Sequence, residues 1–130
     1  MVDDRAATET DVVTKRTPQW VADTVAKLTA MVTAKATRLF AVIDQAAEAW
    51  QAGLTLRETT LVLFGRPAAG TPVMAASPLS ALDLPLKVLI WADDGQTKVS
   101  YYAPAALAAS HHLPAGLAGI NALTDALVAA

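Results

Sequence analysis

The sequence contains no cysteine, which excludes disulfide bonds, thiol nucleophiles and thiolate metal sites. It also lacks any run of about 18 apolar residues, so we expect no helix to span a membrane. Neither sign of charge is in large excess, because 10 Lys and Arg stand against 12 Asp and Glu, for a net charge of −2. No basic block provides the electrostatic footprint of a nucleic-acid binder. We therefore predict neither a nucleic-acid partner nor a membrane partner.

The residues that are present suffice for one hydrophobic core. The chain has 130 residues, of which 54% are hydrophobic, and this length suits a single domain. Residues 1–10 are polar and carry no apolar segment of the kind that directs secretion, so we predict a flexible N-terminal arm and a cytoplasmic location. Residues 11–130 are predicted to form one α+β domain.

Apolar periodicity predicts five strands and a first long helix. The strand-like runs are Asp11–Thr17, Arg38–Asp44, Thr59–Gly65, Leu86–Ala92 and Thr97–Tyr102. Helical spacing extends from Pro18 to Ala36, with Thr17 as the expected N-cap. Asp44 is placed to cap a short helix that Gly53 would end.

The end of the chain decides the fold class. Asp94 and Gly95 stand between two strand-like runs and predict a hairpin, whereas a parallel sheet would need a helix there. An alanine-rich helix from Pro104 to about His112 and a last helix at about 117–128 follow. We predict an α+β fold: a single-layer antiparallel or mixed sheet of about five strands, in the order β-α-β4-α, with helices packed on one face.

The most unusual stretch is Leu63–Met74, with the sequence L-F-G-R-P-A-A-G-T-P-V-M. Its two glycines have the spacing of a phosphate-binding loop, but Thr71 and Pro72 stand where lysine and serine are required. Its two prolines also remove amide donors. We interpret the stretch as a corner in which Gly65 ends a buried strand and Gly70 adopts a positive φ. Thr71 would then cap a helix that begins at Pro72.

A helix N-terminus beside a basic side chain can still hold a small anion. The candidate ligand-binding residues in the loop are Gly65, Arg66, Pro67, Gly70 and Thr71. Asp44 and Tyr101 join them as polar groups that folding could bring to the same pocket. A small anionic molecule is therefore the ligand class that the sequence suggests for this loop.

His111 and His112 are the only histidines and the candidate metal ligands. Neighbours on a helix point about 100° apart, so two adjacent histidines rarely hold one ion. No obvious third ligand follows them, and histidines at a helix C-terminus are also favoured by the helix dipole. We predict no cofactor.

No catalytic constellation stands out. A serine, a histidine and an acid could compose a triad, but no G-x-S-x-G elbow marks the serine. The acidic residues are scattered, and several have simpler roles in caps and turns. We assign no catalytic residue, and the sequence favours a protein without enzymatic activity.

Three motifs resemble the family catalogued as domain of unknown function 302. They are T-L-V-L-F-G-R-P-A-A-G-T-P-V-M, L-D-L-P-L-K-V-L-I-W-A-D-D-G and V-S-Y-Y-A-P-A-A-L-A, and the similarity runs from about Asp11 to His112. The resemblance implies a β-α-β4-α sandwich related to the TATA-binding-protein-like fold and a homodimer. It implies no activity, substrate or cofactor. The family often has Asn where this chain has Arg66, Lys near the position of Ala68, and His where this chain has Gln45. A reaction that used this family histidine would therefore be lost in this chain.

Three functions stay open from the sequence. The preferred one is a small bacterial-type, non-catalytic homodimeric binding or interaction protein, whose surface includes Gly65–Met74 and the segment through Pro85. The second is an enzyme that holds a small anionic substrate on the loop and uses His111 or His112 as acid and base, which places a histidine in the loop's pocket. The third is a histidine-based metal-binding protein.

Overall fold

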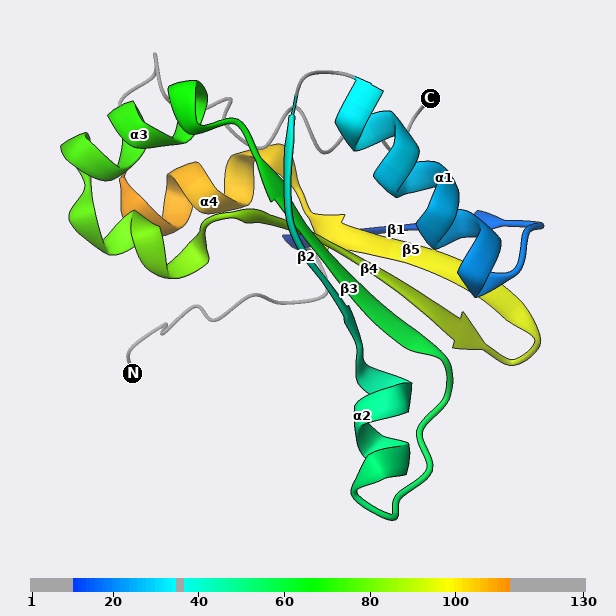
Figure 1. The fold of residues 1–130 in the computed structure, drawn as a ribbon. Helices are drawn as coiled ribbons and strands as arrows, with labels where there is room; N and C mark the ends of the chain where they lie inside the picture. The colour runs from blue at the N-terminus through cyan, green and yellow to red at the C-terminus, as the bar shows by residue number, and fades with distance from the viewer. Residues whose placement is uncertain (1–10, 35–36, 113–130) are drawn as a thin grey trace.

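Five strands form an open sheet in the order β1-β5-β4-β3-β2 (Figure 1). They are β1 (Val12–Thr17), β2 (Arg38–Asp44), β3 (Thr59–Gly65), β4 (Leu86–Asp93) and β5 (Gln96–Tyr102). The structure, a computed structural model, describes residues 11–34 and 37–112, and each strand pair in this part is antiparallel. The predicted α+β class and the five strands are confirmed.

One long helix, α1 (Val21–Ala34), crosses one face of the sheet and packs on β2, β3 and β4. Side chains alternate across a strand, so Val62 of β3 and Val88 of β4 point to the same face. Leu28 and Val32 of α1 pack against them, and all four side chains are at most 6% exposed. Each such burial contributes about 1.5–3 kcal/mol of hydrophobic free energy. This contact is the core of the fold.

The predicted start of α1 at Pro18 is wrong. Thr17 pairs with Thr97 across the β1–β5 ladder, so the strand continues through the residue expected to cap the helix. Its hydroxyl accepts a hydrogen bond from the Gln19 amide at 3.3 Å, and residues 18–20 form a turn before the helix. Trp20, directly before the helix, is 77% exposed. The predicted end at Ala36 lies outside the described residues.

Two local predictions are confirmed. The Ala47 amide donates to Asp44 Oδ1 at 2.9 Å, which caps α2 (Gln45–Gln51). Asp94 and Gly95 have φ values of 56° and 80°, and this pair of left-handed residues closes the β4–β5 hairpin. In both places the side chain or backbone of one or two residues decides the geometry.

The remaining helical elements gather at one end of the sheet, opposite to α2 (Figure 1). They are α3 (Pro67–Ala76), the 3-10 helix η2 (Pro78–Asp83) and α4 (Pro104–His111). Both α3 and α4 pack on η2. The helix predicted at about 117–128 lies outside the described residues. This end of the sheet carries the Gly65–Met74 loop and the candidate site.

Candidate functional site

The loop that leaves β3 is a helix start, and it comes earlier than the sequence suggests. Pro67 is the first residue of α3, with Arg66 as an extended N-cap at φ −118°. Proline suits the first helical position because its φ is fixed and its missing amide has no helical partner there. Thr71 and Pro72 therefore lie inside α3, and the predicted helix start at Thr71 is wrong. Gly70 is helical, so its predicted positive φ is also wrong.

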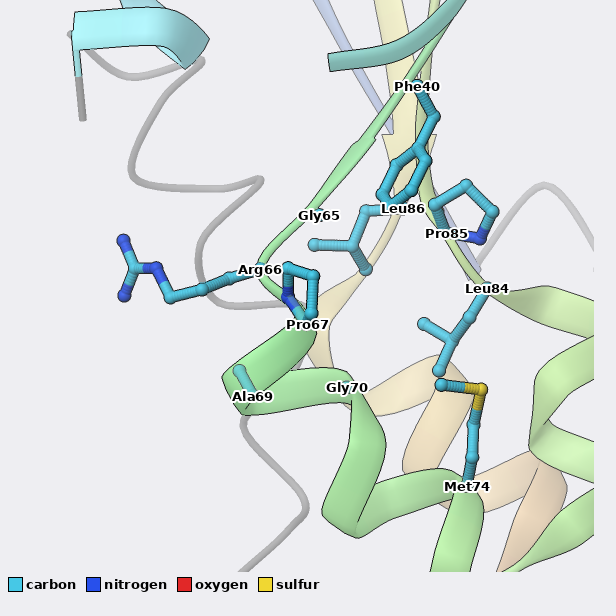
Figure 2. A pocket seen from close by; sticks show the side chains of 10 residues that line it. All are labelled: Phe40, Gly65, Arg66, Pro67, Ala69, Gly70, Met74, Leu84, Pro85 and Leu86. Atoms are coloured by element: carbon cyan, nitrogen blue, oxygen red, sulfur yellow. The ribbon is translucent and has the colours of Figure 1, made fainter. Parts of the chain in front are cut away.

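A cavity of about 410 Å³ opens between this helix and the end of the sheet (Figure 2). Its volume falls in the range of small-molecule sites, which is roughly 300–1,000 Å³. The lining residues come from four segments of the chain: Phe40, Gly65, Arg66, Pro67, Ala69, Gly70, Met74, Leu84, Pro85 and Leu86.

Phe40 reaches the cavity because of a bulge in β2. The β2–β3 register shifts between Leu39 and Ala41, and such an extra residue re-aims a side chain. A Cβ placed on Gly65 would lie 3.5 Å from Phe40 Cε2 and 3.7 Å from Pro85 Cβ, in van der Waals contact. A side chain larger than alanine at Gly65 would displace this aromatic wall. The Arg38 guanidinium lies over the Phe40 ring, 5.4 Å from its centroid.

The walls of the cavity are apolar. In Figure 2 the side chains of Phe40, Met74, Leu84 and Leu86 converge on one space, whereas the Arg66 guanidinium points away from it. Apolar walls of this kind hold a ligand by contact and by release of water. A charged ligand would lose its hydration here without gaining a partner from Arg66.

The N-terminus of α3 offers few donors to an anion. Pro67 has no N–H, and the amides of Ala69 and Gly70 already donate to the Arg66 carbonyl at 2.8 and 2.9 Å. An anion at a helix start is bound by several free amides that point at it. The geometry of the loop therefore favours an apolar ligand over the anion that the sequence suggests.

Lys87 fixes the wall that faces α3. Its Nζ donates to the carbonyls of Asp83 at 3.0 Å and Pro85 at 3.2 Å, on both sides of the Leu84–Pro85 peptide bond, which is cis. Burial lowers the pKa of the Lys87 amine, and the Asp83 carboxylate partly opposes this shift. The amine thus ties together the connection between η2 and β4 that presents Leu84 to the cavity.

The structure brings together four of the predicted ligand-binding residues: Gly65, Arg66, Pro67 and Gly70 line the cavity. Thr71 is exposed and does not line it, and Asp44 caps α2. Tyr101 is 3% exposed in the core, whereas its neighbour Tyr102 is 45% exposed.

Sequence reasoning did not name the other six lining residues as ligand-binding, and two of them, Phe40 and Leu86, also lie outside the predicted surface of Gly65–Met74 and the segment through Pro85. The motif L-D-L-P-L, which ends at Leu86, is the signal that could have indicated this residue. Phe40 has no such signal, because its position depends on the bulge.

The two histidines lie apart from the cavity lining. His111 Nε2 is 2.6 Å from Asp83 Oδ2, and His112 is an exposed residue with φ 50° just after α4. Within residues 11–34 and 37–112, no three His, Cys, Asp or Glu side chains are grouped closely enough to hold a metal ion. His111 and Asp83 form a pair only.

An open antiparallel sheet with a helix across one face and an apolar cavity at its end defines the class of this protein as an α+β domain. A family model described as "Domain of unknown function DUF302" matches residues 13–130, and the chain belongs to that family. A crystal structure of an uncharacterised conserved DUF302 protein from Bacillus stearothermophilus has the same fold. Its TM-score is 0.78 at 18% identity, over 92% of this chain and 93% of that one.

Curated relatives add a second similarity. The chain is 34% identical over 106 residues to proteins named fluoride-specific ion channel FluC 1 from Brucella suis biovar 1 (strain 1330) and Brucella abortus biovar 1 (strain 9-941). The match covers 81% of this chain but 42% and 39% of those proteins, so the chain spans about two fifths of their length. In the part of the chain that the structure describes, no helix has the length and apolar character needed to cross a membrane.

Proposed function

We propose that this protein is a non-catalytic, homodimeric binding module, and that the cavity between α3 and the end of the sheet takes a small, uncharged and mainly apolar molecule. The observation that carries the proposal is the cavity itself. It measures about 410 Å³, and one of its apolar walls is built by the loop motif that is most distinctive in the sequence. A ligand of this kind gains affinity from burial of its surface against Phe40, Met74 and Leu86.

An enzyme acting on a small anion is the weaker alternative. It requires a histidine in the pocket of the loop, whereas His111 lies against Asp83 and neither histidine lines the cavity. It also requires Arg66 to face the ligand, and in Figure 2 this side chain points away. General acid–base chemistry needs the proton donor within about 3 Å of the reacting group. The geometry of the protomer does not support it.

The proposal can be tested by filling the cavity. A Cβ on Gly70 would lie 3.9 Å from Leu84 Cδ1 and Met74 Cε, so the larger side chain of Gly70→Leu is expected to fill space between these two cavity-lining side chains. The matched control is Ala68→Leu, two residues earlier in the same helix, at an exposed residue that does not line the cavity. Indole serves as the neutral apolar probe and inorganic phosphate as the anionic one.

Thermal unfolding and NMR titration should show that indole raises the Tm and shifts resonances of the loop. Gly70→Leu should abolish both effects and Ala68→Leu should preserve them, while phosphate has no effect on any variant. If phosphate bound and indole did not, the apolar assignment would be wrong. If a neutral apolar fragment library produced no binding that Gly70→Leu removes, the cavity would have no ligand.

A second candidate function is an accessory role to an ion channel. The observation that favours it is the 34% identity to two proteins named fluoride-specific ion channel, in which the matched region fills about two fifths of the length. In those proteins the matched region belongs to the same chain as the rest of the channel protein. The partner that this suggests for the present chain is therefore an ion-channel protein. Fluoride efflux from liposomes containing the unmatched part of the Brucella suis relative should change when this chain is added. Unchanged efflux together with no co-purification would reject this role.

A further inference from the structure

The two edges of the sheet present different side chains. The β1 edge carries Lys15 and Arg16 in its second half. The β2 edge carries Leu39, Phe40 and Val42, whose exposed fractions are 37%, 48% and 44%. Edge strands leave backbone N–H and C=O groups unpaired, and proteins commonly protect them with charged side chains. Among the residues that the structure describes, no charged side chain protects the centre of β2, although it is the more apolar edge.

The two ends of β2 carry opposite charges, which makes the edge complementary to a second copy of itself. The strand begins with Arg38 and ends with Asp44, on either side of its apolar centre. If a two-fold axis passes through the middle of the strand, two copies run antiparallel. The Arg38 end of each copy then lies against the Asp44 end of the other. A two-fold contact requires a patch that is complementary to itself, and opposite charges around an apolar centre meet this requirement.

The segment after β2 leaves further apolar side chains uncovered. None of the residues of α2 is buried, and Trp50, Leu54 and Leu56 are 75%, 65% and 44% exposed. Figure 1 shows α2 continuing beyond the end of β2, away from α3. In the antiparallel arrangement, this arm is carried past the Arg38 end of the other copy. That is the end at which Phe40 lines the cavity.

We propose that the outer edge of β2 and the α2 arm, residues 45–56, form the surface on which a second copy of this chain docks about a two-fold axis. Each arm then lies beside the cavity of the other copy and completes its mouth. Phe40 belongs to both surfaces, since it is exposed on the edge and also lines the cavity. The coupling of ligand binding to docking rests on the proposed function. A ligand in the cavity strengthens docking, and docking raises the affinity for the ligand by the same factor.

The absence of cysteine makes cross-linking a direct test. With Arg38 opposite Asp44, Val42 faces Phe40 of the other copy, so the two Val42 residues are diagonal neighbours about 7–8 Å apart, within reach of a short bifunctional thiol-reactive reagent. Val42→Cys should therefore give a covalent dimer rapidly, whereas Arg16→Cys on the exposed part of β1 should not exceed background. Both residues are exposed, and circular dichroism checks that the variants fold.

Two tryptophans of similar exposure, Trp50 at 75% and Trp20 at 77%, provide the matched pair for sedimentation. Trp50→Ala on the arm should weaken self-association by about tenfold, as expected for an aromatic anchor. Trp20→Ala, at a residue 77% exposed beside the β1–α1 turn, should leave it unchanged. A monomer at the highest soluble concentration, equal cross-linking of the two cysteine variants, or equal losses from the two alanine variants would each overturn the docking surface.

These readouts separate the docking surface from the function of the cavity. A monomer that still binds indole in a manner sensitive to Gly70→Leu would overturn the docking proposal and leave the cavity function intact. A dimer that cross-links through Val42→Cys but never binds indole would support the docking surface and reject the cavity function.

Discussion

The Gly65–Met74 loop and the Asp93–Gln96 turn both follow a buried central strand and both contain glycine, but the glycines serve different purposes. Gly95 has φ 80°, and nothing lies within 4 Å of a Cβ placed on it, so only backbone conformation selects glycine there. Gly70 has a helical backbone and borders the cavity, so glycine there leaves volume. The turn is shaped by its own residues, and the loop by what it packs against.

The largest effect is expected where the cavity under the loop meets the core. Leu86 is 6% exposed, lines the cavity and belongs to the core cluster. Leu86→Ala should lower the free energy of unfolding by about 2–5 kcal/mol, because it removes buried contacts and enlarges an existing space. Urea unfolding measures this loss. The control Leu82→Ala, at a residue 79% exposed, should change the value by less than about 0.5 kcal/mol.

The next largest effect is expected in the turn. Gly95→Val should lower the free energy of unfolding by about 1–2 kcal/mol, because an L-residue with a Cβ is strained in the left-handed region. Gly95→Asn should recover much of this loss, since asparagine tolerates that conformation. Urea unfolding of the three proteins compares them. Equal stability of the valine and asparagine variants would show that φ does not select glycine at this position.

Adding a side chain at the loop glycine should have the opposite effect on the free energy of unfolding. Gly70→Ala should raise the free energy of unfolding by about 0.5–1 kcal/mol, because alanine is the better residue in a helix interior. Its methyl group would make ordinary contacts with Leu84 and Met74 at 3.9 Å. Urea unfolding gives the sign, and a weaker response to indole should accompany it. A loss of stability would contradict the helical backbone at Gly70.

The contrast also explains how much of the molecule the sequence predicts. The Asp44 cap, the Asp94–Gly95 hairpin and the strand Thr59–Gly65 are confirmed because each depends on residues a few positions apart. The helix start at Thr71 was predicted wrongly, since two Pro-containing starts compete within one loop and only packing selects between them.

The cavity was not predicted, because its walls come from segments far apart in the sequence. Phe40 reaches it through a bulge whose position depends on pairing with β3. The direction of Arg66 likewise depends on where α3 begins. Five of the seven predicted ligand-binding residues lie in the loop, but only the fold shows that its cavity is apolar.

The smallest effect is expected from the charges that flank the turn. Asp93 Oδ2 accepts a hydrogen bond from Lys98 Nζ at 2.6 Å, and Arg57 lies 3.3 Å from Asp93 Oδ1. The hydrogen bond from Lys98, together with the two positive charges and against some desolvation, lowers the pKa of Asp93. A carboxyl whose pKa is lower in the folded state adds stability above its unfolded pKa, which is about 4, and loses it as the pH falls through the folded pKa.

Asp93→Asn should therefore be slightly less stable than the wild type at pH 7, and the difference should shrink as the pH falls below about 4 and vanish below the lowered pKa of Asp93. Lys98→Met should remove the same pH dependence, because it takes away the donor that lowers the pKa of Asp93. Urea unfolding at a series of pH values compares the three proteins. A difference that persisted unchanged into acid would show that the amide disturbs the hairpin by its shape and that the ion pair contributes nothing. The turn would then depend on its backbone conformation alone, which would make its contrast with the loop sharper still.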